Sequence, residues 1–439
     1  MIYNFVAEQT DAHLDFDITL EQKKNVYCFI GENAVGKTNL LENMARTLLY
    51  CHSMFKEKKQ DNLKYAGVYH QKIIHDDIKD FYLQLALNIF LNQKRVKDKQ
   101  NDNWGFTTFE RLASKPLVFK FDKPLVFIGA QNRGYTKNID KNHIKILGNW
   151  ADRFVETLTR SFNYMNGKAV KETEIADWFN SRLIINPNFV IQNQNRGFEV
   201  ETVFKLMQKL EPQLNLITEK EGKTDLNQVI FHEGELYINE VPIHKLSTGF
   251  VSLIKIFQEI VAAYGGWAGL TNANLNEPEL SHVEGIVFID EIESHLHPKW
   301  QYRIIPLLKE FFPNTTFYIA THSPLIVSAT EEGEAYELIR TNNQVTAPKL
   351  GNPKEWYLTS VFVQAFHVDF LDSESSSNTN APNLLQMLKE YSSIVKDYAS
   401  CQDEKLKHDA EALYQKILPS LADNDPRRRS LDSLRSLLE

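Results

Sequence analysis

Residues 31–38 read Gly-Glu-Asn-Ala-Val-Gly-Lys-Thr, and they say more about the fold than any other part of the sequence. It fills every fixed position of the pattern G-x-x-x-x-G-K-[ST]. A short apolar run, residues 26–30, precedes it, and a segment with helical spacing, residues 39–44, follows it. A phosphate-binding loop needs this order of strand, loop and helix, because its glycines let successive N–H groups point at phosphate oxygens. The stretch therefore predicts an α/β domain that binds a nucleotide.

The loop supplies two side chains with expected roles. We expect the Lys37 ammonium to reach the β- and γ-phosphates of ATP, and the Thr38 hydroxyl to bind Mg²⁺. Other positions in and beside the loop are expected to line the phosphates: Gly31, Glu32, Asn33, Ala34, Val35, Gly36 and Asn39.

Residues 285–291, Gly-Ile-Val-Phe-Ile-Asp-Glu, form an apolar run that ends in two carboxylates. Continuous hydrophobicity is typical of a strand buried on both faces of a parallel sheet, and ligands bind at the C-terminal ends of such strands. We expect Asp290 to hold Mg²⁺ through water beside Thr38. Glu291 is expected to polarise the attacking water as a general base.

A third apolar run, residues 316–320, leads into Thr-His-Ser-Pro. We expect His322, at the end of this strand, to contact a γ-phosphate, because a neutral imidazole donates one hydrogen bond. His295 and His297 stand two positions apart with no cysteine nearby, which is a weak zinc signal. We expect an ordinary loop there, and no metal other than Mg²⁺.

Length and composition fit a globular protein. The chain has 439 residues, 43% of them hydrophobic, and a formal net charge of −8. No apolar run approaches the roughly 20 residues that span a bilayer. The start lacks the basic and apolar regions of a secretory signal, and the three cysteines lie far apart. We expect a soluble, cytoplasmic protein without disulfides.

The charge is unevenly distributed. Residues 51–150 hold 18 basic and 10 acidic side chains, whereas residues 151–439 hold 27 and 40. A basic segment in an acidic protein is consistent with a surface for nucleic acid or an acidic partner. A solvated, lysine-rich insertion is the alternative.

The periodicity predicts four parts: an N-terminal lobe with the phosphate loop and the basic insertion, a helical block, a second lobe, and a C-terminal helical region. Their bounds are 1–142, 143–228, 229–350 and 351–439. The finer pattern predicts a hairpin and a buried strand within the first 30 residues, strands at 82–91, 117–121 and 125–129, a hairpin at 229–238, a helix from Ser247 to about Tyr264, a loop over 265–284, a helix at 298–312 and a linker at 372–382.

Four motifs occur in a fixed order, at residues 31–38, 246–250, 288–298 and 320–324. In this combination the chain resembles the ABC-type ATPase heads of the RecF, Rad50, SMC and OLD group. Within that group it is similar to stand-alone bacterial ATPases of antiphage systems, such as the Septu ATPase PtuA and retron-associated ATPases. The resemblance implies an ABC-type P-loop head with a mainly parallel core sheet, an antiparallel part, an inserted helical block and a C-terminal helical tail.

The resemblance also implies roles for single residues. Ser247, Thr248 and Gly249 match the ABC signature, which in the family caps the γ-phosphate held by a second protomer. Gln131 resembles the Q-loop glutamine, which contacts Mg²⁺ and the attacking water. Glu293 falls in the D-loop, which usually crosses the dimer interface.

Thr248 stands where the commoner signature has glycine, and Ala34 replaces a frequent glycine of the phosphate loop. Both departures are mild and leave the class unchanged.

Three functions follow from the family. The first is an ATP-gated dimer or higher oligomer that regulates a separate effector, such as a nuclease, in antiphage defence. The second is a RecF-like DNA-repair ATPase; a Rad50-like version would need long heptad arms, which residues 143–217 do not offer. The third is an OLD-like ATPase that carries its own nuclease.

Two features of the C-terminal region bear on these alternatives. The acidic pair Asp423 and Asp425 precedes Pro426 in the way that a helix start does, so we expect capping there rather than catalysis. The helical tail, 383–439, is expected either to dock an effector or another subunit, or to pack on the ATPase core.

Overall fold

The computed structural model describes residues 1–52, 89–95, 121–134, 150–165, 175–183, 197–271, 277–367, 384–420 and 426–438, apart from positions 9, 11, 51, 92–93, 132, 221–222, 233–234 and 436–437. The chain divides into two compact units, Met1–Phe366 and His367–Glu439. We describe each unit by itself.

A five-stranded sheet in which all paired strands are parallel forms the centre of the first unit, with the order β14-β3-β13-β12-β6. Its strands are β3 (Val26–Ile30), β6 (Leu125–Ile128), β12 (Ile286–Ile289), β13 (Thr316–Ala320) and β14 (Ala335–Glu337). Because parallel strands share one direction, the segments that follow β3, β13, β12 and β6 all leave from the same edge. Asp290 and Glu291, which follow β12, and His322, which follows β13, therefore lie at the same sheet edge as the phosphate loop, as the sequence predicts.

Both faces of this sheet are buried. In β3, Val26, Cys28 and Ile30 belong to one hydrophobic core, and Tyr27 and Phe29 belong to another. Alternate side chains of a strand point to opposite faces, so a strand covered on both faces has no polar position. This explains the continuous apolar runs of the sequence.

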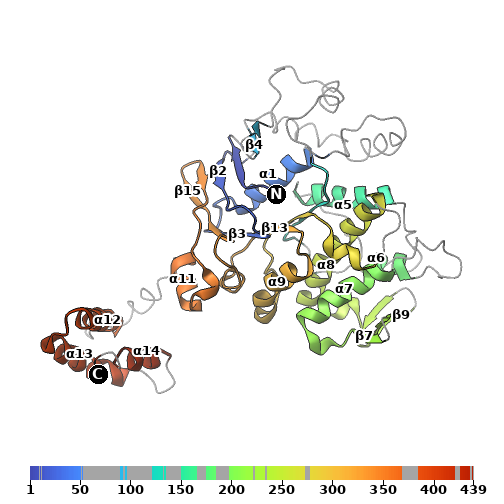
Figure 1. The fold of residues 1–439 in the computed structure, drawn as a ribbon. Coiled ribbons are helices and arrows are strands. Elements are labelled where there is room, and N and C mark those ends of the chain that lie inside the picture. Colours follow the sequence, from blue (N-terminus) through green and yellow to red (C-terminus); the bar gives the residue numbers. More distant parts are fainter. Residues whose placement is uncertain are drawn as a thin grey trace. The chain divides into compact units, whose positions relative to one another are not determined.

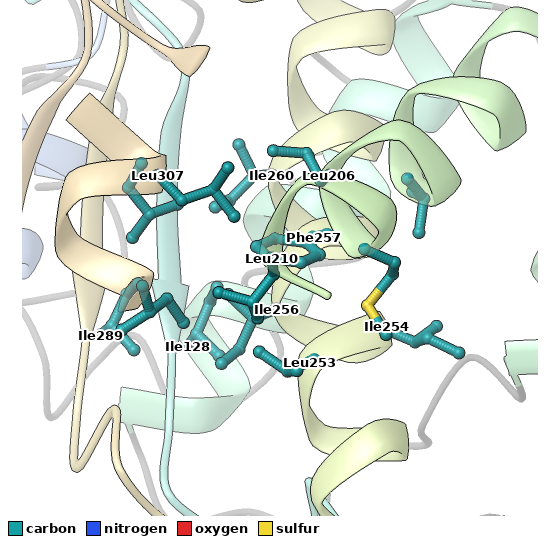
Figure 2. Packing of buried hydrophobic residues seen from close by; sticks show 14 of the residues in the cluster. Ile128, Leu206, Leu210, Leu253, Ile254, Ile256, Phe257, Ile260, Ile289 and Leu307 are labelled. Carbon is teal, nitrogen blue, oxygen red and sulfur yellow. The ribbon is translucent and has the colours of Figure 1, made fainter. Parts of the chain in front are cut away.

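Three helices cover the first face: α7 (Gly197–Leu210), α8 (Thr248–Thr271) and α9 (Pro298–Phe311). Figure 2 shows Ile128 and Ile289 of the sheet facing Leu210, Ile256 and Leu307 of these helices. The second face is covered by α1 (Lys37–Tyr50), which begins within the phosphate loop, and by the antiparallel sheet. Figure 1 shows β3 and β13 between α1 on one side and α8 and α9 on the other.

The antiparallel sheet has the order β15-β16-β2-β1-β4-β5, with one parallel pair, β16 and β2. Its strands are β1 (Asn4–Ala7), β2 (Asp15–Thr19), β4 (Ile89–Leu91), β5 (Lys94–Arg95), β15 (Ile339–Thr341) and β16 (Gln344–Thr346). The predicted N-terminal hairpin is thus β1 and β2, which pair in register from Asn4 opposite Thr19.

The other described elements of the first unit are mostly short. They are α5 (Trp150–Met165), α6 (Ile175–Leu183), η3 (Pro212–Leu214), β7 (Ile217–Lys220), β8 (Lys223–Leu226), β9 (Val229–His232), β10 (Glu235–Ile238), β11 (Val241–Pro242), η4 (Ile243–Lys245), η5 (Glu277–His282), α10 (Pro324–Val327), η6 (Pro353–Glu355) and α11 (Leu358–Phe366). The hairpin expected at 229–238 is confirmed by the pairing of β9 with β10.

Three predicted bounds were wrong. The helix α8 does not stop at Tyr264 but continues through Gly265 and Gly266, two positions on which other helices pack closely. A Cβ atom at Gly265 would lie 2.3 Å from the Glu199 carboxylate, and one at Gly266 would lie 2.9 Å from the Phe154 backbone. The predicted helical block 143–228 ends in the β7–β8 hairpin, which is not helical. The C-terminal region does not begin at 351, since residues 351–366 belong to the first unit.

The second unit is helical, with α12 (Leu384–Cys401), α13 (Glu404–Ile417), η8 (Leu418–Ser420) and α14 (Pro426–Arg435). Its own core contains Tyr391, Val395, Ala410 and Ile417. The helix predicted from Pro426 is present. The linker 372–382 and the acidic pair before Pro426 lie outside the described residues, as do strand 117–120 and most of strand 82–91. Among the helices that the structure describes, none is long and apolar enough to cross a membrane.

Candidate functional site

The phosphate loop has the backbone that its glycines predict. Gly31 has φ +143° and Gly36 has φ +109°, values that side chains rarely allow, and a Cβ atom at Gly36 would lie 2.7 Å from Leu14. Ala34 adopts φ 63° even though it is not glycine. The position at which the sequence departs from the common loop pattern is therefore one that adopts a left-handed conformation.

Lys37 lies within the loop at the first residue of α1. Its Nζ donates to the carbonyl oxygens of Gly31, at 2.8 Å, and Glu32, at 2.9 Å, and the residue is only 7% exposed. Burial lowers the pKa of Lys37 to about 8, although the nearby Asp290 and Glu293 carboxylates oppose this shift. The ammonium is thus held in place and partly desolvated, so an anion that binds in the loop would meet a preorganised positive charge.

Thr38 and Asp290 meet, although 252 positions separate them in the sequence. The Thr38 hydroxyl lies 2.9 Å from one Asp290 carboxylate oxygen and 3.1 Å from the other. Burial raises the pKa of Asp290, Thr38 and Arg133 lower it, and the neighbouring Glu291 charge raises it further. A hydroxyl beside a partly desolvated carboxylate fits Mg²⁺, which prefers oxygen ligands and retains water.

The described residues contain no cluster of three or more His, Cys, Asp or Glu side chains that could hold a metal ion. The Thr38 hydroxyl and the Asp290 carboxylate would supply protein oxygens to a Mg²⁺ ion that also binds phosphate oxygens and water. This is the way in which Mg²⁺ is usually bound in nucleotide sites.

His322 emerges between the phosphate loop and the carboxylates, because β13 lies between β3 and β12 in the sheet. It is partly buried. Burial and the positive charge of Lys37 lower its pKa, which Glu293 and Glu291 partly counter. These shifts favour the neutral imidazole, which carries one N–H donor.

Glu291 adopts the left-handed conformation, with φ 45°. Its carboxylate accepts a hydrogen bond of 3.0 Å from the Ser294 hydroxyl, and its carbonyl oxygen accepts one from the Arg133 guanidinium. Arg133 is only 1% exposed. The sequence did not single out Arg133, because its partner, 158 positions away, becomes a neighbour only through the pairing of β6 with β12.

Gln131 follows β6 and is exposed. The β6–β12 pairing brings the end of β6 level with Asp290, whose N–H donates to the Ile128 carbonyl at 2.9 Å. The structure thus places Gln131 at the same edge of the sheet as the carboxylates, and its contact with Mg²⁺ and water stays a prediction.

The signature residues lie at the start of α8. Ser247 and Thr248 are exposed, and the Ser247 hydroxyl accepts a hydrogen bond of 3.3 Å from the Phe250 N–H, so Ser247 caps the helix. Gly249 is buried, and a Cβ atom there would lie 2.4 Å from the His295 carbonyl oxygen. N–H groups at a helix start favour an anion, and Ser247 and Thr248 are exposed at this start.

Most of the basic segment lies outside the described residues. Of the four closely spaced cations Lys94, Arg95, Lys97 and Lys99, only the backbone of Lys94 and Arg95 is described, in β5. The proposed contact of this segment with nucleic acid stays a prediction. The zinc alternative for His295 and His297 gains no support, since His297 caps α9 by accepting from the Lys299 N–H at 3.2 Å.

One family model matches the chain, over residues 175–328, and it is described as "AAA domain, putative AbiEii toxin, Type IV TA system". The matched residues include the signature, the Asp290–Glu291 pair and His322, but not the phosphate loop.

Three curated proteins are similar to this chain in sequence. The "Retron Vc95 probable ATPase" of Vibrio cholerae serotype O1 biovar El Tor is 23% identical over 85% of this chain and 79% of that protein. The "Retron Ec83 probable ATPase" of Escherichia coli is 30% identical over 37% of this chain and 27% of that protein. The "Septu protein PtuA" of Bacillus mycoides (strain KBAB4) is 24% identical over 78% of this chain and 40% of that protein. The chain thus spans less than half of the length of the last two.

Among solved structures, an SMC head bound to the C-winged helix domain of ScpA has a TM-score of 0.38 at 10% identity, over 80% of this chain and 97% of that one. A nucleotide-free ATP-binding cassette of an ABC transporter has a TM-score of 0.35 at 13% identity, over 83% and 99%. The strand order and the motifs of this chain agree with the ABC-type P-loop fold that the sequence predicts, and in sequence the chain is similar to the retron ATPases and to the Septu protein PtuA.

Proposed function

We propose that the protein hydrolyses ATP to ADP and phosphate in a Mg²⁺-dependent reaction. The observation that carries this proposal is the contact of Thr38 with Asp290 beside a buried, preorganised Lys37. These three groups match what a nucleoside triphosphate with its metal requires: a cation for the phosphates, and a hydroxyl and a carboxylate for Mg²⁺.

Each side chain at the sheet edge would have one task in this reaction. Lys37 binds the β- and γ-phosphates, and Thr38 and Asp290 hold the metal, which neutralises phosphate charge when bound. Glu291 takes a proton from the attacking water, and His322 donates a hydrogen bond to the γ-phosphate. Gln131 would help to orient the same water.

We also propose that the site is completed by the signature of a second copy, so that ATP closes a dimer or higher oligomer. Ser247 and Thr248 support this proposal, because they are exposed at a helix start and can meet the γ-phosphate of another protomer. The buried Gly249 would let the chain pass close to the His295 carbonyl rather than contact phosphate through a side chain.

The test combines two substitutions. Glu291→Gln should bind Mg-ATP but lower the turnover number by about 10²–10⁴-fold, and it should accumulate as an ATP-bound dimer in light scattering. Adding Ser247→Asp should prevent that closure, because aspartate caps the helix equally well but brings a like charge to the γ-phosphate. The matched control, Ser247→Asn, keeps the cap without the charge and should still close.

A substitution at Gly249 would be a poor test, since any side chain there would displace the His295 carbonyl. Mixing Lys37→Ala with Ser247→Asp adds a second test. One composite site of the mixed dimer keeps an intact loop and an intact signature, so ATPase activity should partly recover. Full activity of Ser247→Asp alone would refute the shared site, whereas an unchanged ATP affinity of Lys37→Ala in calorimetry would refute the phosphate loop itself.

We further propose that this ATPase works in the cytoplasm as the sensor or regulator of a separate effector, such as a nuclease, in antiphage defence. The names of the retron and Septu relatives support this role. The test is to co-purify the chain with its genomic neighbours, with and without ATP, and to measure the mass and nuclease activity of the complex. A chain that binds no neighbour and cleaves DNA alone would refute the separate effector.

Direct binding of nucleic acid through residues 51–150 is a subsidiary proposal, supported by the positive charge of that segment. Affinity for DNA should fall steeply with salt. Reversing the charges of Lys94, Arg95, Lys97 and Lys99 should weaken it, and an unchanged affinity would refute the proposal.

A further inference from the structure

Glu293 lies in the turn between β12 and α9, close after Asp290 and Glu291. The turn is fixed to the sheet, because the N–H of the fully buried Ile292 donates to the Ala320 carbonyl at 3.3 Å. The Glu293 carbonyl in turn accepts from the Leu296 N–H at 2.8 Å. With the backbone held in this way, the side chain of Glu293 points at the end of the neighbouring strand β13.

The Glu293 carboxylate there accepts two hydrogen bonds from the histidine segment of its own chain. One oxygen accepts from the Thr321 hydroxyl at 2.6 Å, and the other accepts from the backbone N–H of His322 at 2.6 Å. Hydrogen bonds to a carboxylate are about twice as strong as those between neutral groups. Both oxygens are therefore occupied within the chain, which argues against the D-loop role across a dimer interface that the family resemblance implies for Glu293.

Thr321 makes the arrangement rigid. It is fully buried, and its backbone N–H donates to the Phe29 carbonyl at 3.1 Å, on the strand that leads into the phosphate loop. Its hydroxyl, which donates to Glu293, also accepts from the Ser323 N–H at 3.0 Å. The backbone on both sides of His322 is thus fixed through one hydroxyl and one carboxylate.

We propose that Glu293 is the positioning residue of His322. It ties the turn between β12 and α9 to this histidine, whose proposed role is to contact the γ-phosphate. This inference rests on the proposed ATPase function. The same turn also touches the signature helix, since the Ser252 hydroxyl donates to the Ser294 carbonyl at 3.3 Å. A shift of the signature helix on ATP binding would therefore reach His322 through Glu293.

The test compares Glu293→Gln with Thr321→Val and with Glu310→Gln. An amide has only one acceptor oxygen, so Glu293→Gln loses one bond and sets an N–H group against a donor. It should lower the turnover number at least about tenfold, with the ATP dissociation constant changed less than about twofold. Thr321→Val should give an intermediate loss. Glu310→Gln, which loses an exposed charge paired with Lys209, should change neither.

A double-mutant cycle with His322→Ala separates positioning from general damage. If Glu293 acts through His322, adding Glu293→Gln to His322→Ala should lower turnover by less than about twofold further. An additive loss would overturn the inference, and so would a loss that appears only in the ATP dissociation constant.

A second measurement does not depend on hydrolysis. Hydrogen–deuterium exchange at the His322 amide should become at least about tenfold faster in Glu293→Gln and stay unchanged in Glu310→Gln, because only the first variant disturbs the bond that protects this amide. Unchanged exchange would overturn the inference. A wild-type protein without ATPase activity but with this exchange result would refute the proposed function and leave the positioning contact supported.

Discussion

ATP binding should be coupled to the uptake of a proton by Lys37. In the free protein, burial lowers the pKa of Lys37 to about 8, and the residue is only 7% exposed. Bound phosphates bring negative charge to the ammonium, so they favour its charged form and raise its pKa again. A group whose pKa rises on binding takes up a proton. The affinity for ATP must then fall as the pH rises through the pKa of the free protein.

The size of this fall in ATP affinity follows from the pKa of Lys37 in the free protein. With a pKa of about 8, roughly nine-tenths of Lys37 is charged at pH 7 and roughly one-tenth at pH 9. The ATP association constant should therefore fall about tenfold between these values, which is about 1.4 kcal/mol. Other groups at the site interfere little in this range, because the pKa of His322 is lowered from its usual value of 6.5 and a phosphate monoester titrates near pH 6.

Isothermal titration calorimetry at pH 7, 8 and 9, in buffers with different ionisation enthalpies, measures the ATP association constant and the number of protons taken up. The number of protons taken up per ATP should rise from about 0.1 at pH 7 to about 0.9 at pH 9. The control is Lys37→Arg, whose guanidinium stays charged throughout, so its affinity should not change with pH. If the affinity of the wild-type protein for ATP stays constant from pH 7 to 9 and no proton is taken up, the Lys37 ammonium is not partly desolvated in the free protein.

Other predictions concern packing, positioning and the metal. Gly265→Ala should lower the free energy of unfolding by roughly 1–3 kcal/mol in denaturant titrations, because its Cβ would lie 2.3 Å from Glu199. A change below about 0.5 kcal/mol would contradict this tight contact. Arg133→Ala should lower turnover at least about tenfold, because it removes the donor to the Glu291 carbonyl. Added guanidinium should restore part of this activity and methylammonium should not; equal effects would refute the specific contact. Asp290→Asn should remove the strengthening of ATP binding by Mg²⁺ in calorimetry, and an unchanged Mg²⁺ effect would place the metal elsewhere.

Much of the site could be predicted from short stretches of sequence. The glycines and Lys37 of the phosphate loop act within eight consecutive positions, so their chemistry is visible in the chain itself. The buried strands β3, β12 and β13 are visible for a similar reason, because a strand covered on both faces needs an unbroken apolar run. From these strands it also follows that Asp290, Glu291 and His322 lie at one sheet edge, since parallel strands end on the same side.

Other features depend on neighbours that only the tertiary structure supplies. Gly265 and Gly266 indicate a loop in the sequence, yet they lie inside α8, where the close approach of Glu199 and Phe154 leaves no room for a Cβ atom. Propensity is a weak signal, and close packing overrides it where a side chain would not fit. The β7–β8 hairpin within the predicted helical block is a second case, because pairing between strands is absent from any single run of residues.

The phosphate-binding and metal-binding roles that we propose can be read from the sequence alone, because they require particular residue types at short, fixed spacings. The groups that hold these side chains in place can be known only from the folded chain. The strand order sets β13 between β3 and β12, and it thereby brings Glu293 to His322, and the β6–β12 pairing brings Arg133 to Glu291. These contacts join residues 29 and 158 positions apart, and no local pattern specifies them, because they arise from the order in which the strands pair.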